Sequence, residues 1–435
     1  MRMSVIGCGY LGAVHAASMA KLGHEVVGID VDPAKIEALA AGKSPIFEPG
    51  LPELLVESVG SGRLSFSTDT SAARGAKVHF IAVGTPQKAG SYAADLRFVD
   101  AAVEGLMPHL APGDLVVGKS TVPVGTAERL AKMIEPTGAM LAWNPEFLRE
   151  GFAVKDTISP DRLVYGLPPE PADAATAQAL LDEVYAEALS HDTPLVATDY
   201  ATAELVKVAA NAFLATKISF INAMAEISEA AGADVTQLAD AIGYDARIGR
   251  RFLNAGAGFG GGCLPKDIRA FSARAEELGK GEALNFLKEV DAINLRRRDR
   301  VVELVVEALG GSAYNKKVAV LGLAFKPDSD DIRDSPSLDV AVRLNGLGAN
   351  VVATDPEAIA NSRRMHPQLV FGTTEEALQD ADAVVVVTEW SEYRALDPVA
   401  VAAVVRGTVV IDGRNCLDLA AWRGAGWTYI GLGRK

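Results

Sequence analysis

Positions 5–12 read Val5-Ile6-Gly7-Cys8-Gly9-Tyr10-Leu11-Gly12. This stretch lies between a predicted strand at 3–7 and a predicted helix at 13–22. Glycines in the pattern G-x-G-x-x-G, placed between a strand and a helix, permit a tight turn and let a pyrophosphate approach the backbone at the helix N-terminus. The sequence therefore predicts a dinucleotide-binding loop. Its candidate cofactor-binding residues are Gly7, Gly9, Tyr10, Leu11 and Gly12.

An aspartate supports this interpretation. Asp30 ends a second predicted strand at 25–30 and follows Gly12 by 18 residues. A carboxylate there accepts hydrogen bonds from the adenosine ribose hydroxyls and repels a 2′-phosphate, which favours NAD over NADP. The alternative is a strand-end aspartate that caps the next turn, and the complete glycine motif favours the cofactor role. Lys35 is a further candidate for the same ribose.

Apolar strands alternate with helical patterns at both ends of the chain. The later predicted strands lie at 78–83, 115–119 and 140–143, and then at 317–321, 350–354, 383–388 and 409–412. Such alternation predicts parallel sheets that are covered by helices on both faces.

The segment 199–232 differs from its surroundings because it holds no proline and no internal glycine. It predicts one helix of roughly 50 Å, at about 1.5 Å per residue. The predicted fold class is α/β, with two Rossmann-like doubly wound domains joined by a long central helix and a helical dimerisation segment. The predicted domains are 1–198, 199–306 and 307–435.

Composition narrows the classes of function. The 435 residues carry a net charge of −14, which argues against a dedicated nucleic-acid binder. The three cysteines, Cys8, Cys263 and Cys416, are far apart and lack metal-ligand spacing, so no metal site or disulfide framework is expected. No signal peptide and no apolar run of membrane-spanning length is recognised. These features predict a cytoplasmic protein that has no membrane partner.

A glycine-rich loop precedes the second cysteine, in Gly258-Phe259-Gly260-Gly261-Gly262-Cys263-Leu264-Pro265-Lys266-Asp267. The glycines leave the backbone bare, so a ligand can come close. A thiolate stabilised by a helix N-terminus or a nearby cation is a strong nucleophile toward an aldehyde. A small buried cysteine in a turn is the alternative, and the loop alone does not decide between them. Cys8 and Cys416 are interpreted as structural.

The chain resembles the UDP-glucose/GDP-mannose dehydrogenase family from end to end. The matching segments are 5–12, 120–126 (STVPVGT), 144–151 (NPEFLREG), 211–214 (NAFL), 258–267 and 325–327 (FKP). Small departures occur at Ala257, at Gly262, where the family often has serine, and at Leu264, where an aromatic residue is common. The resemblance implies an N-terminal Rossmann domain for NAD, a helical dimerisation domain and a C-terminal nucleotide-sugar domain, with the site between the outer domains.

The resemblance also implies a reaction, in which a sugar C6 alcohol is oxidised twice. One NAD takes a hydride to leave an aldehyde, and Cys263 attacks the aldehyde to form a thiohemiacetal. A second NAD takes another hydride, and water hydrolyses the resulting thioester to a uronate.

Catalytic roles follow from the same resemblance. Lys207 and Asn211 lie four residues apart on one helix face and can donate hydrogen bonds to the oxyanion at C6. Asp267 should position a water with Thr121 or assist the first proton removal, and the base of that step stays open. Glu146 is the candidate for activating the hydrolytic water. Ordinary solvated, capping or helix-packing roles are the alternatives for these residues.

Binding roles are implied for two further sets. The additional cofactor-binding candidates are Thr85, Thr121, Glu150, Lys266 and Arg333. The substrate-binding candidates are Glu146, Phe147, Leu148, Glu150, Lys207, Asn211, Arg247, Phe259, Gly260, Gly261, Cys263, Phe325, Lys326 and Arg414. The amides of 259–262 suit a diphosphate, and Lys326 and Arg414 suit sugar and phosphate contacts. Arg247 resembles an arginine that the family supplies across a dimer interface, which implies a homodimer or higher homo-oligomer.

The expected substrate is UDP-glucose, with UDP-glucuronate as the product. The segment 144–147 resembles the glucose and mannose branches of the family, and 325–328 with 330–333 resembles the UDP-glucose branch. GDP-mannose is the nearest competitor. A dehydrogenase that oxidises a 3-hydroxy acid once would need no catalytic cysteine. A non-catalytic sensor of NAD or nucleotide sugar would be expected to lose Cys263, Lys207 or Asp267, and all three are present.

Overall fold

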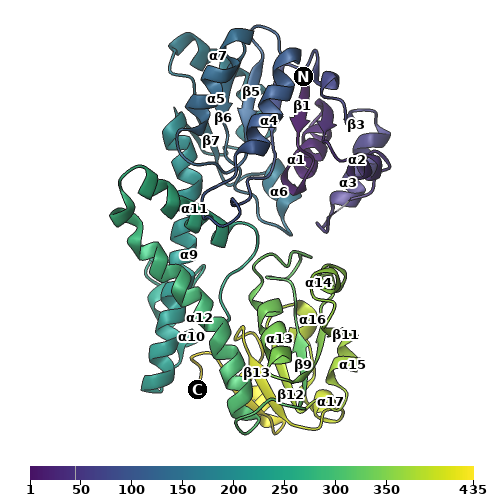
Figure 1. The fold of residues 1–435 in the computed structure, drawn as a ribbon, viewed down its shortest axis with the longest axis vertical. Helices are drawn as coiled ribbons and strands as arrows, with labels where there is room; N and C mark the ends of the chain where they lie inside the picture. Colours follow the sequence, from purple (N-terminus) through teal and green to yellow (C-terminus); the bar gives the residue numbers. More distant parts are fainter. Residues whose placement is uncertain (45) are drawn as a thin grey trace. The chain divides into compact units, whose positions relative to one another are not determined.

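A computed structural model describes residues 1–44 and 46–435. The chain forms two compact units, which are described separately (Figure 1). Unit 1 comprises 1–210 with 273–278, and unit 2 comprises 211–272 with 279–435.

Unit 1 is built on an eight-stranded sheet in the order β3-β2-β1-β4-β5-β6-β7-β8. Its strands are β1 (Arg2–Ile6), β2 (Glu25–Ile29), β3 (Leu64–Ser67), β4 (Val78–Ile81), β5 (Leu115–Gly118), β6 (Met140–Trp143), β7 (Leu163–Leu167) and β8 (Leu195–Asp199). The first six strands are parallel, and β7 and β8 run the other way. The strand order reverses between β1 and β4, so the carboxyl ends of these strands form the switch point where such sheets bind ligands.

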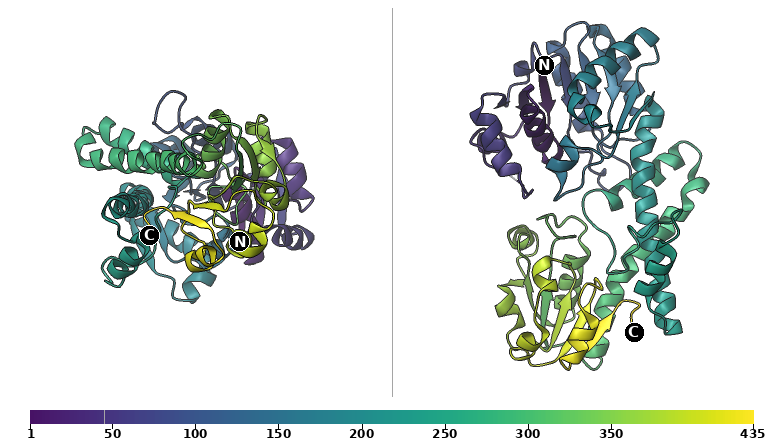
Figure 2. Two further views of the ribbon diagram at one scale, coloured as in Figure 1. Left: turned by 90° about the horizontal axis from the view of Figure 1, so that it is seen from below. Right: turned by 180° about the vertical axis from the view of Figure 1, so that it is seen from behind.

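Two apolar clusters cover the two faces of this sheet. One packs α1 and α3 against the strands, and the other packs α4 and α5 (Figure 2). The helices of unit 1 are α1 (Tyr10–Lys21), α2 (Pro33–Ala40), α3 (Leu51–Gly60), α4 (Arg97–Leu106), α5 (Thr126–Ile134), α6 (Ala153–Ile158), α7 (Pro171–Val184) and α8 (Ala186–Ser190). Single 3₁₀ turns lie at Thr70–Ala73, Met107–His109 and Glu135–Thr137.

The long helix predicted at 199–232 is α9 (Tyr200–Ala231), which ends at Gly232 with a φ of +68°. One window of α9 is apolar and long enough to span a membrane by composition, so the expectation of no such run is wrong. Within unit 2 one face of the helix packs against the rest of the unit. Ser219 Oγ donates to the Val290 carbonyl at 2.7 Å, and Asn222 Oδ1 accepts from the Gly256 amide at 2.9 Å.

Unit 2 contains a six-stranded parallel sheet in the order β11-β10-β9-β12-β13-β14. The strands are β9 (Lys317–Leu321), β10 (Asn350–Thr354), β11 (Val370–Phe371), β12 (Ala383–Val386), β13 (Val409–Asp412) and β14 (Thr428–Gly431). The helices are α10 (Val235–Gly243), α11 (Leu264–Glu277, whose C-terminal end lies in unit 1), α12 (Asn285–Ala308), α13 (Pro336–Gly346), α14 (Ile359–Met365), α15 (Thr374–Leu378), α16 (Ser391–Arg394), α17 (Pro398–Ala402) and α18 (Leu419–Gly424). A 3₁₀ turn lies at Gly281–Leu284.

Both sheets begin in the same way. The Gly7 amide after β1 donates to the Ile29 carbonyl at 2.7 Å, and the Gly322 amide after β9 donates to the Thr354 carbonyl at 2.9 Å. An aspartate, Asp30 or Asp355, then follows the neighbouring strand. The predicted class of two Rossmann-like units and a long helix is therefore confirmed, with a repeat in backbone geometry that the sequence does not display.

Candidate functional site

The loop from β1 to α1 forms a cradle for an anion. Gly7 has a φ of +91°, and a Cβ at Gly12 would lie 1.7 Å from the Gly7 carbonyl oxygen, so neither position admits a side chain. A Cβ at Gly9 would meet no protein atom within 4 Å. Open space therefore lies in front of the amides that begin α1, where a pyrophosphate fits. The residues present fit a dinucleotide.

Asp30 and Lys35 are brought together beside this loop, as predicted. Asp30 Oδ2 accepts from the Cys8 amide at 2.8 Å and from Lys35 Nζ at 2.9 Å, and Oδ1 accepts from the Asp32 amide at 3.1 Å. A carboxylate has about four acceptor sites, so one remains for a ribose hydroxyl. Burial, followed by the Asp30 charge, raises the pKa of Cys8 to about 12, which supports its interpretation as a structural thiol.

Glu48 is a functional candidate that the sequence analysis missed. Its buried carboxylate accepts the Tyr10 hydroxyl, and it also accepts the amides of Gly151 and Ala153, each at 2.7 Å. It thereby ties the first turn of α1 to the loop that carries Glu150. Burial raises the pKa of the Tyr10 hydroxyl, so this phenol stays protonated.

The loops after β4, β5 and β6 gather several predicted residues at one edge of the sheet. Thr85 Oγ1 donates to the Thr121 carbonyl at 2.8 Å, which joins two of these loops. Glu146 Oε1 accepts the amides of Phe147 at 2.8 Å and Leu148 at 3.1 Å. The structure therefore places the carboxylate of Glu146 against its own loop.

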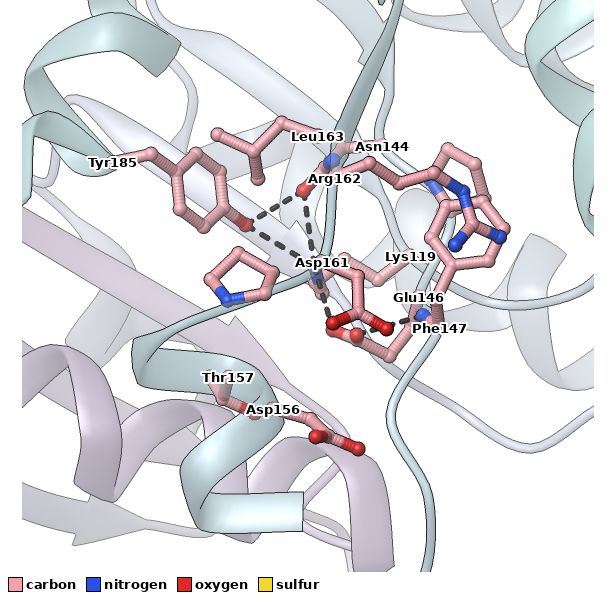
Figure 3. A pocket seen from close by; sticks show the side chains of 12 residues that line it. Lys119, Asn144, Glu146, Phe147, Asp156, Thr157, Asp161, Arg162, Leu163 and Tyr185 are labelled. Atoms are coloured by element: carbon pink, nitrogen blue, oxygen red, sulfur yellow. Dashed lines mark hydrogen bonds and ion pairs between the residues drawn. The ribbon is translucent and has the colours of Figure 1, made fainter. Parts of the chain in front are cut away.

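Lys119 was also missed, although it immediately precedes the Ser120-Thr121 motif. Its ammonium is buried and lies 2.9 Å from Asn144 Oδ1, 3.1 Å from the Tyr185 hydroxyl and 3.0 Å from Glu146 Oε2 (Figure 3). Burial acts to lower the pKa of Lys119, but the Glu146 carboxylate and the Tyr185 hydroxyl more than offset it, and the pKa is raised. These side chains line a cavity of about 30 Å³.

Lys207 lies in α9 and faces Phe147. Its Nζ is 5.5 Å from the centre of the Phe147 ring, and the Arg162 guanidinium carbon lies 3.9 Å from the same ring. Phe147 is therefore in contact with two cations, an arrangement that its electron-rich faces favour.

In unit 2, α11 begins at Leu264, immediately after Cys263. Of the three cysteines, Cys263 is the exposed one, and the positive end of the helix favours its thiolate. Asp267 is buried in the first turn, where its Oδ2 accepts from Asn211 Nδ2 at 2.6 Å and its Oδ1 lies 2.7 Å from Lys266 Nζ. The structure therefore brings Asn211 of α9 to Asp267, four residues after Cys263.

The glycines before Cys263 have protein neighbours. A Cβ at Gly260 would lie 2.4 Å from the Asp334 carbonyl oxygen, and one at Gly261 would lie 2.8 Å from the Phe325 ring. Close packing of the chain therefore requires glycine at these two positions, independently of any ligand.

Two amides of this loop are committed to protein. The Phe259 amide donates to Asn294 Oδ1 at 2.7 Å, and the Gly261 amide donates to the Arg333 carbonyl at 2.8 Å. The prediction that all amides of 259–262 suit a diphosphate is therefore wrong for these two in this structure. Asn294 also donates from Nδ2 to the Phe259 carbonyl at 2.9 Å, so it clamps the loop from both sides.

Arg414 braces loops instead of presenting a free guanidinium. It donates to the carbonyls of Gly258 at 2.7 Å, Val387 at 2.7 Å and Phe325 at 3.2 Å. These donors hold the Gly258 and Phe325 loops together, and the predicted sugar or phosphate contact of Arg414 stays a prediction.

The remaining predicted basic residues lie on the surface of unit 2. Arg333 Nη2 lies 2.6 Å from Asp331 Oδ2, and the Arg333 guanidinium lies against Gly262. The Lys326 ammonium lies 5.4 Å from the Phe325 ring. Arg247 pairs with Asp245 at 2.6 Å, and its side chain is 89% exposed.

The loop that carries Lys326 is anchored by Asp355. Asp355 Oδ2 accepts the amides of Leu323 at 2.7 Å and Ala324 at 2.9 Å, and also the Trp390 indole N–H at 3.1 Å. Asp355 follows its strand as Asp30 does in the other sheet. Here, however, the Trp390 indole N–H binds the carboxylate, whereas Asp30 keeps an acceptor site for a ribose hydroxyl.

The chain is similar to known proteins along its whole length. It matches the NAD-binding domain of the UDP-glucose/GDP-mannose dehydrogenase family over residues 1–189, the family's central domain over 201–296 and its UDP-binding domain over 319–419. It is 41% identical to UDP-glucose 6-dehydrogenase of Rhizobium meliloti, over the full length of both chains. It is also 41% identical to UDP-glucose 6-dehydrogenase YwqF of Bacillus subtilis, over all of this chain and 98% of that protein.

A solved UDP-glucose dehydrogenase from Pyrobaculum islandicum shares 39% identity and a TM-score of 0.90, covering 100% of this chain and 98% of that one. The three domain matches together span most of the chain, and they contain the cofactor loop, the cysteine loop and the helix that carries Lys207 and Asn211. The chain therefore belongs to the UDP-glucose/GDP-mannose dehydrogenase family.

Proposed function

We propose that the chain is a UDP-glucose 6-dehydrogenase, which oxidises the C6 alcohol of UDP-glucose to a carboxylate. The observation that carries the proposal is the exposed Cys263 at the N-terminus of α11, with the buried Asp267–Asn211 pair one turn further along. The names of the full-length relatives support UDP-glucose over GDP-mannose as the substrate.

The cofactor site is assigned to the loop after β1. Gly7, Gly9 and Gly12 leave room for the pyrophosphate, and Asp30 with Lys35 binds the adenosine ribose. NAD held by these residues would supply the hydride acceptor for both oxidations at C6. Further contacts to the cofactor are assigned to Tyr10, Leu11, Thr85, Thr121, Glu150, Lys266 and Arg333.

Cys263 turns the intermediate aldehyde into a form that can be oxidised again. Its thiolate attacks the aldehyde carbon, so a C–S bond forms and the carbonyl oxygen becomes an oxyanion. Lys207 and Asn211 donate to this oxygen, and Asp267 fixes the Asn211 amide by accepting its other N–H. We assign Asp267 either to position a water with Thr121 or to assist removal of the alcohol proton in the first step.

Hydrolysis completes the reaction. Oxidation of the thiohemiacetal leaves a thioester on Cys263, and Glu146 accepts a proton from the water that attacks it. The carbonyl carbon gains a C–O bond, the C–S bond breaks, and Cys263 leaves as a thiolate that is ready for another sugar.

The nucleotide sugar is assigned mainly to unit 2. Phe325 and Lys326 lie on the loop after β9, and Arg414 holds that loop to Gly258. The proposed substrate set also retains Glu146, Phe147, Leu148, Glu150, Phe259, Gly260 and Gly261. We also propose a division into three domains at 198 and 306, because the three domain matches begin and end near these positions.

Self-association is proposed through α9. Phe213, Phe220 and Ile227 recur every seven residues and are 67%, 48% and 62% exposed. Apolar residues with this spacing form one stripe on a helix, which suits packing against a second copy. The exposed Arg247 would then be offered to the partner's substrate. A free catalytic thiol requires a reducing compartment, so we propose a cytoplasmic enzyme.

The test is to incubate the protein with limiting UDP-glucose and excess NAD and to count the NADH formed. Two NADH per sugar, lost in Cys263→Ala and kept in the matched control Cys416→Ala, is the expected result. One NADH per sugar would mean that oxidation stops at the aldehyde. No NADH with UDP-glucose, but turnover of GDP-mannose, would replace the proposed substrate.

A further inference from the structure

Lys119 is a buried cation without a role in the chemistry described above. It follows β5, is 4% exposed, and lies on the same side of unit 1 as the NPEF loop. An ammonium in such surroundings is costly unless it is paired and hydrogen-bonded. The fold therefore holds this charge for a reason beyond packing.

The ammonium has three donors and three oxygen partners. Two partners are neutral, and they are fixed to each other, since the Tyr185 hydroxyl donates to Asn144 Oδ1 at 2.6 Å. Asn144 is fixed in turn by a hydrogen bond from Nδ2 to the Val164 carbonyl at 3.0 Å. The third partner, Glu146 Oε2 at 3.0 Å, is the only charged one that the described structure gives to Lys119.

Glu146 depends on this contact for its position. Its Oε1 is held by two amides of its own loop, whereas Oε2 has Lys119 as its fixed neighbour, on the wall of the 30 Å³ cavity. The cavity is large enough for a water molecule, and it is lined by polar groups that can bind one. Figure 3 shows Lys119 between Tyr185 and the Glu146 carboxylate.

From this geometry we infer that Lys119 is a positioning residue for the hydrolysis step, which anchors Glu146 Oε2 and fixes the direction of the carboxylate. The inference rests on the proposed function, because it concerns the base of that reaction. In the step itself, water forms a C–O bond to the thioester carbonyl and passes a proton to Glu146. The C–S bond breaks, and Glu146 then releases the proton to solvent.

Without the ammonium, Glu146 Oε2 would lose its fixed neighbour, and only the two loop amides on Oε1 would hold the carboxylate. A base that is no longer held in one direction activates water less effectively. Hydrolysis in a Lys119→Met variant should therefore be slower than in the wild type. His15 is buried and its pKa is lowered by that burial, so it does not replace the lost charge. The other titratable groups that face the network are Tyr185, Asp156, Asp161, Arg162 and Lys207.

The test separates hydride transfer from hydrolysis in single turnovers. Enzyme in excess over UDP-glucose is mixed with NAD, and NADH formation is followed by absorbance. The uronyl adduct on Cys263 is measured by mass spectrometry of the acid-quenched protein. In Lys119→Met we expect hydride transfer within about threefold of the wild type. Hydrolysis should slow by about 100-fold, since misplacing a catalytic group by about 1 Å costs that much, and the adduct should accumulate. Lys132→Met, at an exposed lysine of α5, is the matched control and should behave as the wild type.

A double variant guards against a folding defect. If Lys119 acts through Glu146, Lys119→Met/Glu146→Gln should hydrolyse the adduct as slowly as Glu146→Gln alone, and the neutral pair should fold more readily. Full additivity of the two effects, or wild-type hydrolysis in Lys119→Met, would overturn the inference. A wild type that forms no adduct on Cys263 would instead overturn the proposed function, so the two failures are distinguishable.

Discussion

Gly9 and Gly12 must both be glycine, but for different reasons. A Cβ at Gly12 would collide with the Gly7 carbonyl at 1.7 Å, whereas a Cβ at Gly9 would meet only open space. Protein packing therefore requires glycine at position 12, and the proposed pyrophosphate requires glycine at position 9. The sequence motif treats both positions alike, and only the structure separates them.

Alanine at these two positions should fail in different ways. Gly12→Ala should cost about 3 kcal/mol of unfolding free energy, the upper end of overpacking costs, and lower the Tm. Gly9→Ala should change stability by about 0.5 kcal/mol, because alanine is a slightly poorer N-cap than glycine, and should weaken NAD binding at least tenfold. Thermal unfolding and NAD titration of the two variants check this. Equal Tm losses would contradict it.

Asp30→Asn tests cofactor choice. Loss of the charge should raise the KM for NAD about tenfold, in line with about 1.5 kcal/mol for a hydrogen bond to a charged group. NADP should gain in relative rate, because repulsion of its 2′-phosphate is removed. Asp32→Asn, two residues along at the N-cap of α2, is the control and should leave the ratio of the two cofactors unchanged. An unchanged ratio in Asp30→Asn would remove the assigned role.

Sequence reasoning missed two residues, Glu48 and Lys119, whose partners lie far away along the chain. Cys263 and Asp267 are separated by one helical turn, so their association follows from the helix start. Glu48 meets Gly151 and Ala153, and Lys119 meets Tyr185, across 66 to 105 residues of chain. No local pattern in one sequence encodes such contacts, because they arise only when the sheet assembles.

At the scale of elements, α9 and α5 meet through one carboxylate. Glu204 in α9 is buried and accepts the amides of Gly125 and Ala127 at the N-terminus of α5, each at 2.7 Å. The helix dipole and these donors favour the anion, but burial is the larger influence and raises the pKa of Glu204 to about 7.

This raised pKa predicts a pH dependence of stability. The contribution of Glu204 is fully present below its unfolded pKa near 4.5, and it is lost as pH rises through about 7, because the folded state pays more to ionise the group. Unit 1 should therefore lose up to ~3 kcal/mol between pH 4.5 and pH 8 from this residue, at about 1.4 kcal/mol per pKa unit. In Glu204→Gln that part of the slope should vanish in denaturant titrations. An identical slope in wild type and variant would show that Glu204 stays ionised throughout.

Strong elements were predictable and weak ones were not. The predicted strands at 317–321, 350–354 and 409–412 match β9, β10 and β13, since each is a short, mainly apolar run. β8 was not predicted because its apolar run is only three residues long, and all five residues of LVATD are partly or largely exposed. Edge strands of this kind are defined by pairing with a neighbour, here β7, which the sequence does not reveal.

At the scale of the whole molecule, the exposed stripe of α9 is the proposed contact with a second copy. Phe220→Asp would place a charge in the middle of the proposed apolar contact, and Phe213 and Ile227 flank it. We expect this variant to sediment as a monomer and to lose at least tenfold in kcat/KM, because the partner's Arg247 would no longer be supplied. Phe286→Asp, at an apolar residue of α12 that is 51% exposed, is the control and should remain associated. A Phe220→Asp variant that sediments as the wild type would place self-association elsewhere.

The two Rossmann-like units were predictable because short apolar strands alternate with helical patterns in both. Their different uses followed from the family resemblance and not from the residues alone, because an aspartate follows the second strand of each sheet. Only the structure shows that the Trp390 indole satisfies Asp355.

That indole gives the protein an intrinsic optical reporter. Trp390 shares an acceptor with the two amides just before Phe325 and Lys326, so movement of that loop alters the field around the ring. We therefore expect UDP alone to change tryptophan emission in a saturable way, and Trp390→Phe to abolish that change while the other three tryptophans still emit. Emission that stays constant under saturating UDP would show that the loop is already in its bound conformation. Either result measures nucleotide binding without a label and without turnover.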